Sequence, residues 1–457
     1  MHEEIKNPMG YEKELNILVK MSVPAMISML VQSIYNLVDS YFVSHIGEKA
    51  LRAVSLAFPI YLIMIGIGVG TGIGVNSYIS RKMGERNYEE VGNGVVTGVV
   101  TLFISWIVFL GFRFLFIDKF YNMFTTDENV VSMGIDYLGI VSLFSIFLFY
   151  QILAEKVIQA TGKMKIAMFS HLMSAIMNII LDPILIHGLL FFPKMGVKGA
   201  AIATIFSQFM GMFFILLYMI RNRKKLGIRF RGSKVRLYTA KQIYAVALPT
   251  IFINAFSSVM QIAVNRIIGN ITEISITVLG LYIRLQSFVY MPIFGLGQGF
   301  MPLVGFNYGA GNKDRIINLY KHAVGISLIF TTIGIFVFQA FPRELIMIFN
   351  KEKMVVELGL TAIRILSISV LFAPLTIVNT VFFQGLGNGI YGLIITLIRQ
   401  FIFVIPLTYV FSFIGLNYVW IAFPISELVG LLLSFYFYNK VMNTKVRCIS
   451  TVCQEVK

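Results

Sequence analysis

Two acids in otherwise apolar stretches are the residues most able to do chemistry. Asp39 lies in the apolar segment 15–47. At membrane depth a carboxylate costs at least about 2.5–3.5 kcal/mol, so it needs a partner, a proton or water. On a helix, Gln32, Asn36 and Asp39 share one face because they are spaced by four and three residues. We expect this polar stripe to face a cavity. The alternative is a structural acid that a neighbouring hydroxyl or amide satisfies.

The second acid, Asp182, stands in the sequence Asn-Ile-Ile-Leu-Asp-Pro. Asn178 shares its helix face, and Pro183 has no N–H to donate to the carbonyl of Ile179. Carbonyl, amide and carboxylate oxygens suit a small cation, and a carboxylate in an apolar wall can also take up a proton. Asp39 and Asp182 both fall late in outward-running spans, so we expect them to meet. The alternative is that Asn178 and Asp182 cap a helix end broken by proline.

The segments around these acids indicate an integral membrane protein. Of the 457 residues, 57% are hydrophobic and 13% are charged, which is more apolar than a soluble core of this size holds. The first apolar segment is too long for a signal-peptide core and lacks a small-residue cleavage site, so we expect nothing to be removed. Cys448 and Cys453 have no histidine neighbours, which predicts free thiols rather than a disulfide scaffold or a zinc site.

Twelve apolar stretches are long enough to cross a membrane, which takes about 20 residues as a helix. The expected spans are 15–46, 51–80, 91–117, 129–160, 164–187, 197–221, 241–269, 274–305, 316–341, 354–386, 389–413 and 416–440. The sequence therefore predicts an all-α integral membrane protein.

The net charge of +16 lies mostly in the short connections between these spans. In a soluble protein such a charge would suggest nucleic-acid binding, but here it fits the excess of basic residues on the cytoplasmic side of a membrane. The connections on one side carry more lysine and arginine than those on the other. We therefore expect a multi-pass protein of the inner (plasma) membrane with both termini in the cytoplasm, and no nucleic-acid partner.

An internal repeat divides the chain into halves. A constant offset in residue number, 225, superimposes Pro24 on Pro249, Gly70 on Gly295, Gly74 on Gly299, Gly84 on Gly309, Asn87 on Asn312 and Gln159 on Gln384. From Gly196 onward, which matches Gly415, the offset is 219. Six spans in each half enter the membrane in the same sense. We expect two pseudo-symmetric six-helix bundles (1–221 and 241–440) around a central cleft, a basic cytoplasmic linker (222–240) and a tail (441–457).

The second half does not repeat the acids of the first. Val264 stands at the position that matches Asp39. The polar residues expected to face a cavity are Gln261, Asn265, Gln286, Asn379 and Gln384, in addition to Gln32 and Asn36 in the first half. Ion coupling is therefore expected in the first half. Glu427 is either a second protonatable group or, as we favour, an acid paired with a basic neighbour.

The remaining motifs point away from cofactors. The glycine run 66–74 has no Gly-Lys-Ser/Thr ending and no preceding strand, so close helix packing is favoured over a phosphate cradle, and ATP is not expected as the energy source. His45, His171, His187 and His322 show no metal-ligand spacing and are interpreted as ordinary polar residues. The abundant methionine and aromatic side chains suit the binding of flat apolar molecules.

Several of these motifs together resemble the multidrug and toxic compound extrusion (MATE) family. They are Pro24, the Asp39 helix, the Gly84-Glu-Arg-Asn turn with its partner Gly309-Ala-Gly-Asn, Leu181-Asp-Pro, and Gly196-Val-Lys-Gly-Ala-Ala-Ile-Ala-Thr204. Within the family the chain is most similar to the bacterial MepA-like group. The resemblance implies a twelve-helix antiporter that exports organic, often cationic, compounds in exchange for Na⁺ or H⁺.

The resemblance also implies a cation site, possible for Na⁺, at Asp39, Asn178, Asp182 and Thr204, of which Thr204 is supplied by the resemblance alone. NorM-type members use acids in the second half as well, but this sequence has none in its seventh span and only Glu357, close to the start, in its tenth. We expect no cofactor, small organic substrates that are often cationic and aromatic, a lipid-embedded monomer and no enzymatic activity. The alternatives are a flippase for lipids or lipid-linked oligosaccharides, and a membrane acyltransferase, for which no nucleophile cluster is found.

Overall fold

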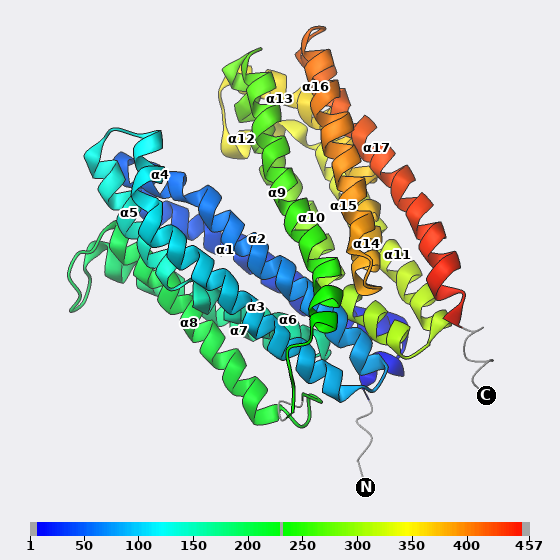
Figure 1. Ribbon diagram of the computed structural model, residues 1–457. Coiled ribbons are helices and arrows are strands. Elements are labelled where there is room, and N and C mark those ends of the chain that lie inside the picture. The colour runs from blue at the N-terminus through cyan, green and yellow to red at the C-terminus, as the bar shows by residue number, and fades with distance from the viewer. Residues whose placement is uncertain (1–6, 229–231, 450–457) are drawn as a thin grey trace, which may run out of the picture. The chain divides into compact units, whose positions relative to one another are not determined.

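A computed structural model describes residues 7–228 and 232–449, without the side chains of residues 36, 37, 39–41, 43 and 44. Every regular element in these residues is helical (Figure 1). Eleven helical segments in the described residues are long and apolar enough to span a membrane, and the pair α5 and α6, bent by 44°, would make a twelfth span if it crosses as one. The predicted all-α membrane fold is therefore confirmed.

The helices follow the expected spans closely, with two short additions. In chain order they are η1 (Pro8–Gly10), α1 (Glu14–Ser44), α2 (Glu48–Gly84), α3 (Tyr88–Leu115), α4 (Ile117–Phe124), α5 (Glu128–Leu143), α6 (Ser145–Ala160), α7 (Met164–His187), α8 (Val197–Asn222), α9 (Leu237–Gly269), α10 (Glu273–Gly309), α11 (Lys313–Ala340), α12 (Pro342–Phe349), α13 (Lys353–Leu366), η2 (Ser367–Leu371), α14 (Ala373–Gly385), α15 (Gly389–Leu397), η3 (Ile398–Val404), α16 (Ile405–Ser412), α17 (Leu416–Val441) and η4 (Met442–Val446). The additions, α4 and α12, are too short to cross a membrane.

The helix bounds reproduce the sequence repeat. The first residues of α2 and α10, Glu48 and Glu273, are separated by the first repeat offset, and the first residues of α4 and α12 are separated by the same offset. The first residues of α8 and α17, Val197 and Leu416, are separated by the second offset. Both offsets read from the sequence thus hold for whole helices, including the two short helices that the sequence analysis did not predict.

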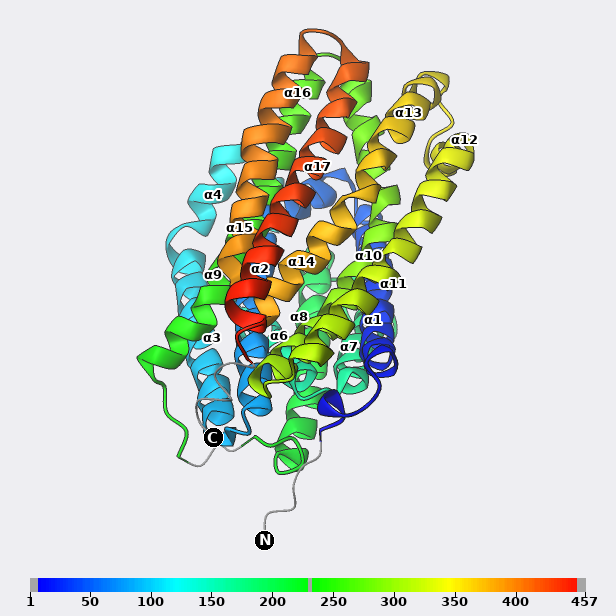
Figure 2. The ribbon, with the colours of Figure 1, turned by 90° about the vertical axis from the view of Figure 1, so that its right-hand side faces the viewer.

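The chain divides into two compact units. Among the described residues, unit 1 contains 27–247, and unit 2 contains 7–26 together with 248–449. In unit 1, α2, α3, α6 and α8 run side by side (Figure 1). In unit 2, α14 lies against α17 and α12 against α13 (Figure 2). The chain passes from one unit to the other inside α1 and again inside α9, so each unit holds the first part of a helix that continues in the other unit.

We call residues 14–26 of α1 and 237–247 of α9 the exchanged segments. Each packs closely against a glycine, and the two glycines occupy matching positions in the repeat. A methyl group on Gly74 of α2 would lie 2.4 Å from the carbonyl oxygen of Ile243 in α9. A methyl group on Gly299 of α10 would lie 2.8 Å from the backbone nitrogen of Ser22 in α1. The two glycines are one of the pairs that the sequence repeat superimposes. Close backbone approach thus explains part of the glycine run, as the packing interpretation predicted.

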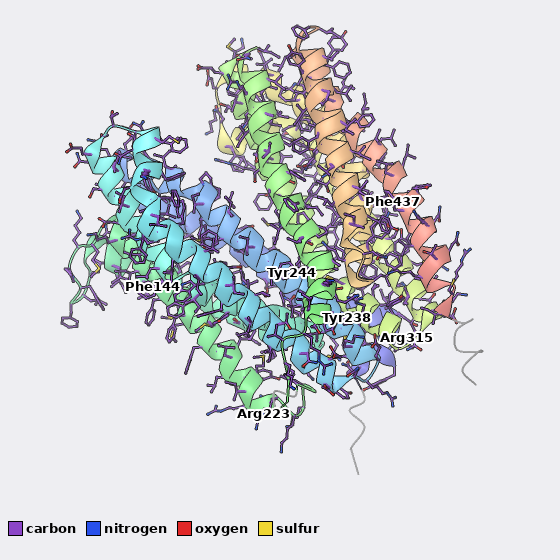
Figure 3. The ribbon with its side chains drawn as sticks, in the orientation of Figure 1. Phe144, Arg223, Tyr238, Tyr244, Arg315 and Phe437 are labelled. Carbon is purple, nitrogen blue, oxygen red and sulfur yellow. The ribbon has the colours of Figure 1, made fainter. Side chains whose placement is uncertain are left out.

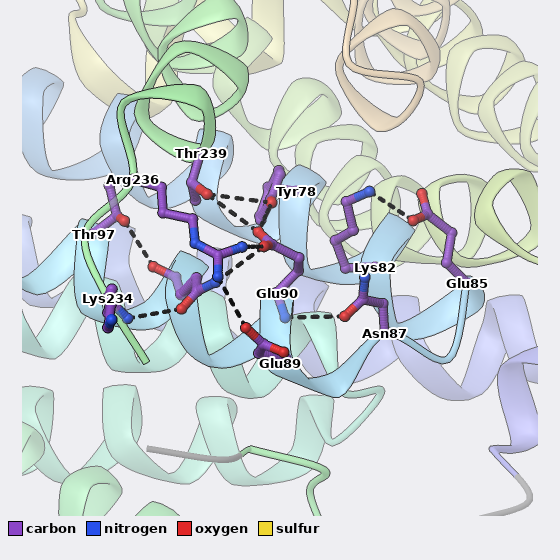
Figure 4. A network of polar contacts seen from close by, with 11 residues as sticks. Tyr78, Lys82, Glu85, Asn87, Glu89, Glu90, Thr97, Lys234, Arg236 and Thr239 are labelled. Carbon is purple, nitrogen blue, oxygen red and sulfur yellow. Dashed lines mark hydrogen bonds and ion pairs between the residues drawn. The ribbon is translucent and has the colours of Figure 1, made fainter. Parts of the chain in front are cut away.

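A polar network, here called the α9 latch, fixes the start of α9 in unit 1 (Figure 4). At its centre the Glu90 carboxylate of α3 accepts hydrogen bonds from Tyr78 at 2.5 Å, Asn93 at 3.0 Å and Thr239 at 3.2 Å. The Arg236 guanidinium donates to the same carboxylate at 2.6 Å. Four donors therefore converge on one acid; they come from α2, α3, the first turn of α9 and the residue that precedes α9.

Unit 2 contains a counterpart, the α1 latch, with the charges reversed. Arg315 of α11 stands at the position that the repeat superimposes on Glu90. Its guanidinium donates at 2.6 Å to the backbone carbonyl of Glu12 and at 3.2 Å to Asn307 Oδ1, and its Nη1 lies 3.5 Å from the Glu14 carboxylate. A base on α11 thus holds the start of α1, where an acid on α3 holds the start of α9.

Loss of the Glu90 charge is expected to loosen the α9 latch. We expect Glu90→Gln to lower the unfolding free energy by about 2 kcal/mol, because charged hydrogen bonds contribute about 1.5–3 kcal/mol each but Arg236 is half exposed to solvent. Thermal unfolding in detergent measures the change. The matched control is Glu89→Gln, whose side chain is 66% exposed and whose ion pair with Arg236 should contribute less than about 1 kcal/mol. Equal shifts for both variants would contradict the role of Glu90.

Each unit also contains a break within one span, at matching positions. In unit 1 the break between α5 and α6 falls at Phe144, labelled in Figure 3, and the carbonyl of Leu143 accepts a hydrogen bond of 2.9 Å from the Trp106 indole. In unit 2 the break is η2, and the carbonyl of Leu366 accepts one of 2.8 Å from the Tyr282 hydroxyl. An aromatic donor from a neighbouring helix thus satisfies a backbone oxygen at each break.

Candidate functional site

Three of the four residues predicted for the cation site, Asn178, Asp182 and Thr204, lie on the antiparallel pair α7 and α8. The register of this pair is set at two levels. A methyl group on Gly199 would lie 2.5 Å from the Leu185 carbonyl oxygen, and the Ser174 hydroxyl donates at 2.6 Å to the Ser207 carbonyl. From residue 199 to residue 207 along α8, the contacting residue of α7 changes from 185 to 174, so the two helices run in opposite directions. The residues in the stretch between these two contacts therefore lie at the same depth on the two helices.

Asn178 and Asp182 form a buried pair within this stretch. Their exposed fractions are 1% and 0%, and the Asn178 amide donates to Asp182 Oδ1 at 3.2 Å. Asn178 Oδ1 is also buried, and no hydrogen-bond partner for it occurs in the described part of the chain. A buried amide oxygen with no donor would cost about 1–3 kcal/mol, which a bound cation would offset. The pair therefore offers oxygen ligands of the kind that suit a small cation.

The capping alternative for this pair is wrong. Helix α7 does not end at Pro183 but continues through it to His187. Asn178 and Asp182 are therefore interior residues of a spanning helix rather than caps of a broken end. A carboxylate so placed is expensive in a membrane and usually marks an ion or proton pathway.

Thr204 lies on α8, 3% exposed, between the two contacts that set the register. It stands five residues after Gly199, whereas Asp182 stands three before Leu185, the residue that Gly199 faces. In an antiparallel pair these steps bring Thr204 level with the segment from Asn178 to Asp182. The resemblance named Thr204, and the register places it at the depth of the pair.

The fourth predicted member cannot be placed. Asp39 lies in α1, but its side chain and that of Asn36 are outside the described part of the structure. The meeting of Asp39 with Asp182 therefore stays a prediction. Gln32, on the same stripe of α1, is described: its Oε1 atom lies 2.9 Å from His171 Nε2 on α7.

A second buried cluster, centred on Glu155 of α6, was missed by the sequence analysis. Its Oε1 atom accepts hydrogen bonds from Ser170 at 3.0 Å and Gln151 at 3.1 Å, and its Oε2 atom lies 3.5 Å from His171 Nδ1. Glu155 is only 7% exposed. His171 had been interpreted as an ordinary polar residue, but here its ring joins a buried acid to α1.

A spacing pattern could have revealed this cluster. His171, Ser174, Asn178 and Asp182 recur at intervals of three, four and four along α7, so one polar stripe carries both clusters. On α6, Gln151 stands four residues before Glu155. The signal was therefore present for each helix, but no sequence spacing connects one helix with the other.

The polar candidates of the second half are distributed over separate contacts. Gln286 donates to the hydroxyls of Tyr282 at 3.0 Å and Tyr290 at 2.9 Å. Asn379 accepts from Tyr320 and donates to Ser434, which ties α14 to α11 and α17. The three other candidates differ in exposure: Gln384 is buried and donates to Thr250, Asn265 is half-buried and Gln261 is exposed.

Glu427 is paired, as the sequence analysis favoured. Arg399 Nη1 lies 2.9 Å from Glu427 Oε1 and 2.8 Å from Oε2, and each side chain is less than one fifth exposed. Arg399 belongs to η3, a π-helical turn. A permanent cation thus neutralises this acid of unit 2.

Curated proteins similar to this chain are named multidrug export proteins. Multidrug export protein MepA of Staphylococcus haemolyticus is 26% identical over 429 residues, which are 93% of this chain and 93% of MepA. MepA of Staphylococcus aureus is 24% identical over 405 residues, 86% of each chain. A solved structure of a MATE protein in complex with MaL6 is 24% identical, covers 99% of this chain and 100% of its own, and has a TM-score of 0.88, which shows a shared fold.

Two six-span repeats with polar groups buried on the spanning helices are typical of multi-pass membrane transporters. The family model described as MatE matches residues 24–184 and 249–410, more than half of the chain. The two matched segments begin at Pro24 and Pro249, a pair that the sequence repeat superimposes. The chain therefore belongs to the MatE family, and it is a transporter, not an enzyme. The family resemblance noted in the sequence is confirmed.

Proposed function

We propose that this chain is a cation-coupled multidrug efflux antiporter, which exports organic, often cationic, compounds in exchange for Na⁺ or H⁺. The observation that carries the proposal is the Asn178–Asp182 pair. It places a carboxylate and an amide oxygen without a described donor in the interior of a spanning helix. The name of the MepA relatives, multidrug export proteins, supports the substrate class.

In the proposed cycle, Asp182 provides the negative charge that attracts the ion, and Asn178 and Thr204 provide neutral oxygen ligands. Asp39 completes the site from α1. The ion enters from outside and favours the conformation that releases the substrate outward. Its departure to the inside then permits the next substrate to bind. This coupling requires the site to hold the ion more tightly in one conformation, because equal affinities would shift no population.

We further propose that the chain acts as a monomer in the plasma membrane with both termini in the cytoplasm. The basic connections support this orientation, since lysine and arginine are retained on the cytoplasmic side. The segment 232–236, which leads into α9, supplies Arg236 to the α9 latch. In this orientation both latches act at the cytoplasmic ends of the helices.

Efflux from vesicles tests the proposal. The protein is reconstituted into liposomes loaded with ethidium, and a Na⁺ gradient or a pH gradient is imposed separately. We expect one gradient to accelerate ethidium export and the collapse of that gradient to stop it, with protein-free liposomes as the control. Export at the protein-free rate under both gradients would contradict the proposal and would leave the flippase alternative, which movement of a fluorescent lipid in the same liposomes would detect.

A further inference from the structure

The Glu155 cluster lies outside the site proposed for the coupling ion and is built from three helices. Glu155 and Gln151 come from α6, Ser170 and His171 from α7, and Gln32 from α1. On α8, Gly211 provides only its carbonyl, which accepts from Ser170 at 3.0 Å. A side chain at Gly211 would fill the space of the cluster, since an added methyl group would lie 2.5 Å from Gln151 Nε2. The absence of a side chain at Gly211 thus lets Gln151 lie directly against α8.

Both nitrogens of the His171 ring face oxygen atoms. Nε2 lies 2.9 Å from Gln32 Oε1, and Nδ1 lies 3.5 Å from Glu155 Oε2. A neutral imidazole has one N–H donor and one acceptor nitrogen, so it can serve only one of these oxygens as a donor. An imidazolium has two donors and can serve both. The arrangement therefore suits a ring that carries an additional proton beside an ionised glutamate.

The charged and titratable groups near Glu155 and His171 come from α6 and from the helices packed against it. On α6 itself, Lys156 adds a positive potential at Glu155, while its ammonium donates to Gln159 at 3.0 Å. Several titratable groups on the helices packed against α6 are engaged in other contacts: Tyr78 of α2 donates to Glu90 of α3, Tyr61 of α2 accepts from Gln208 of α8, and Asp136 of α5 pairs with Lys198 of α8. The carboxylate of Glu155 is thus the acid that faces the imidazole.

We propose that Glu155 and His171 form a proton-binding pair, and that the protonated His171 ring holds α1 to α7 through Gln32. Loss of the proton leaves one ring nitrogen as an acceptor opposite an oxygen, so either the Gln32 amide turns to donate its N–H to that nitrogen or one of the two contacts opens, and the charge-assisted hold is lost in both cases. Because Gln32 shares a helix face with Asp39, opening its contact frees the stripe of α1 that leads to the ion site. The pair goes beyond the proposed function, since it operates whether the coupling ion is Na⁺ or H⁺.

Nitrogen NMR of the histidine rings tests the protonation of His171 directly and does not depend on transport. The protein is labelled with ¹⁵N-histidine in nanodiscs, and His171→Gln assigns the His171 signals. At about pH 6.5 we expect both ring nitrogens of His171 to carry a proton in the wild type, and only one to do so in Glu155→Gln. His187→Gln, at the other end of the same helix, is the control and should leave the His171 signals unchanged. A neutral His171 ring in the wild type, or the same protonation in Glu155→Gln, would overturn the proposal.

Hydrogen exchange tests the hold on α1. We expect the backbone amides of residues 27–35, corrected for intrinsic rates, to exchange at least about threefold more slowly at about pH 6 than at about pH 8.5 in the wild type and in His187→Gln. In His171→Gln and Glu155→Gln this difference should vanish. If these variants instead changed the exchange rate equally at both pH values, the cluster would be purely structural. That result would overturn the proposal. Neither the NMR result nor the hydrogen-exchange result depends on ion-driven efflux, so failure of the liposome experiment would not change them.

Discussion

Replacement of Asp182 by asparagine is expected to reduce ion-driven ethidium efflux at least about a hundredfold, equivalent to about 2.7 kcal/mol of lost ion binding. Asparagine has nearly the same shape and keeps a group that can bond Asn178. It cannot, however, carry the negative charge that attracts a cation, and it cannot take up a proton. The variant should therefore reach the membrane in normal amount, but its conformations should no longer differ in their affinity for the ion. Initial rates of efflux from liposomes under the driving gradient measure the change.

The matched control is Asp136→Asn in the same unit. Asp136 lies on α5 and forms a partly exposed ion pair of 3.2 Å with Lys198, which should contribute less than about 1 kcal/mol. We expect its efflux to stay within about twofold of the wild type. Asp39→Asn should behave as Asp182→Asn does, since the proposed site needs both carboxylates. Wild-type efflux in Asp182→Asn, with the protein confirmed in the liposomes, would remove Asp182 from the mechanism.

Alanine at Gly74 is expected to have the largest effect on stability. The added methyl group would lie 2.4 Å from the carbonyl oxygen of Ile243, which belongs to the backbone and cannot rotate away. Helix α9 must therefore shift from α2, and such overpacking costs about 1–3 kcal/mol or more. We expect a melting temperature in detergent about 5–10 °C below that of the wild type.

Two comparisons isolate this steric effect. Gly66→Ala places the same methyl group on the same helix, where no atom lies within 4 Å, and should leave the melting temperature within about 2 °C of the wild type. In the other repeat, Gly299→Ala should destabilise the protein as Gly74→Ala does, whereas Gly280→Ala, also without an atom within 4 Å, should not. Similar melting temperatures for Gly74→Ala and Gly66→Ala would show that the exchanged segment of α9 does not depend on a close backbone contact.

The spanning helices could be predicted from the sequence because a membrane requires long uninterrupted apolar segments. The bounds predicted for α7, 164–187, agree with the structure. Helices α4 and α12 were missed because eight residues carry no such signal. The exchanged segments were also missed, since the contact of Gly74 with α9 links residues far apart in the chain. A repeated glycine indicates close packing but does not identify the partner.

The candidate site was predictable to the extent that it lies within one helix. Asn178 and Asp182 are four residues apart, so their contact follows from the helical period, and the register of α7 and α8 adds Thr204. The Glu155 cluster needs side chains from α1, α6 and α7, and nothing in the sequence aligns those helices. The pairing of Arg399 with Glu427 likewise joins η3 to α17, and the sequence could only suggest that some basic neighbour exists.

The most direct test of the central claim is whether binding of the coupling ion weakens binding of the substrate, and whether this effect requires Asp182. Ethidium binding to purified protein is measured by fluorescence while the Na⁺ concentration, or the pH, is varied alone. The ion that drives export should weaken ethidium binding at least about tenfold in the wild type and in Asp136→Asn, because linkage between two sites is reciprocal. In Asp182→Asn the affinity should no longer respond to that ion. The same response in Asp182→Asn as in the wild type would contradict the account.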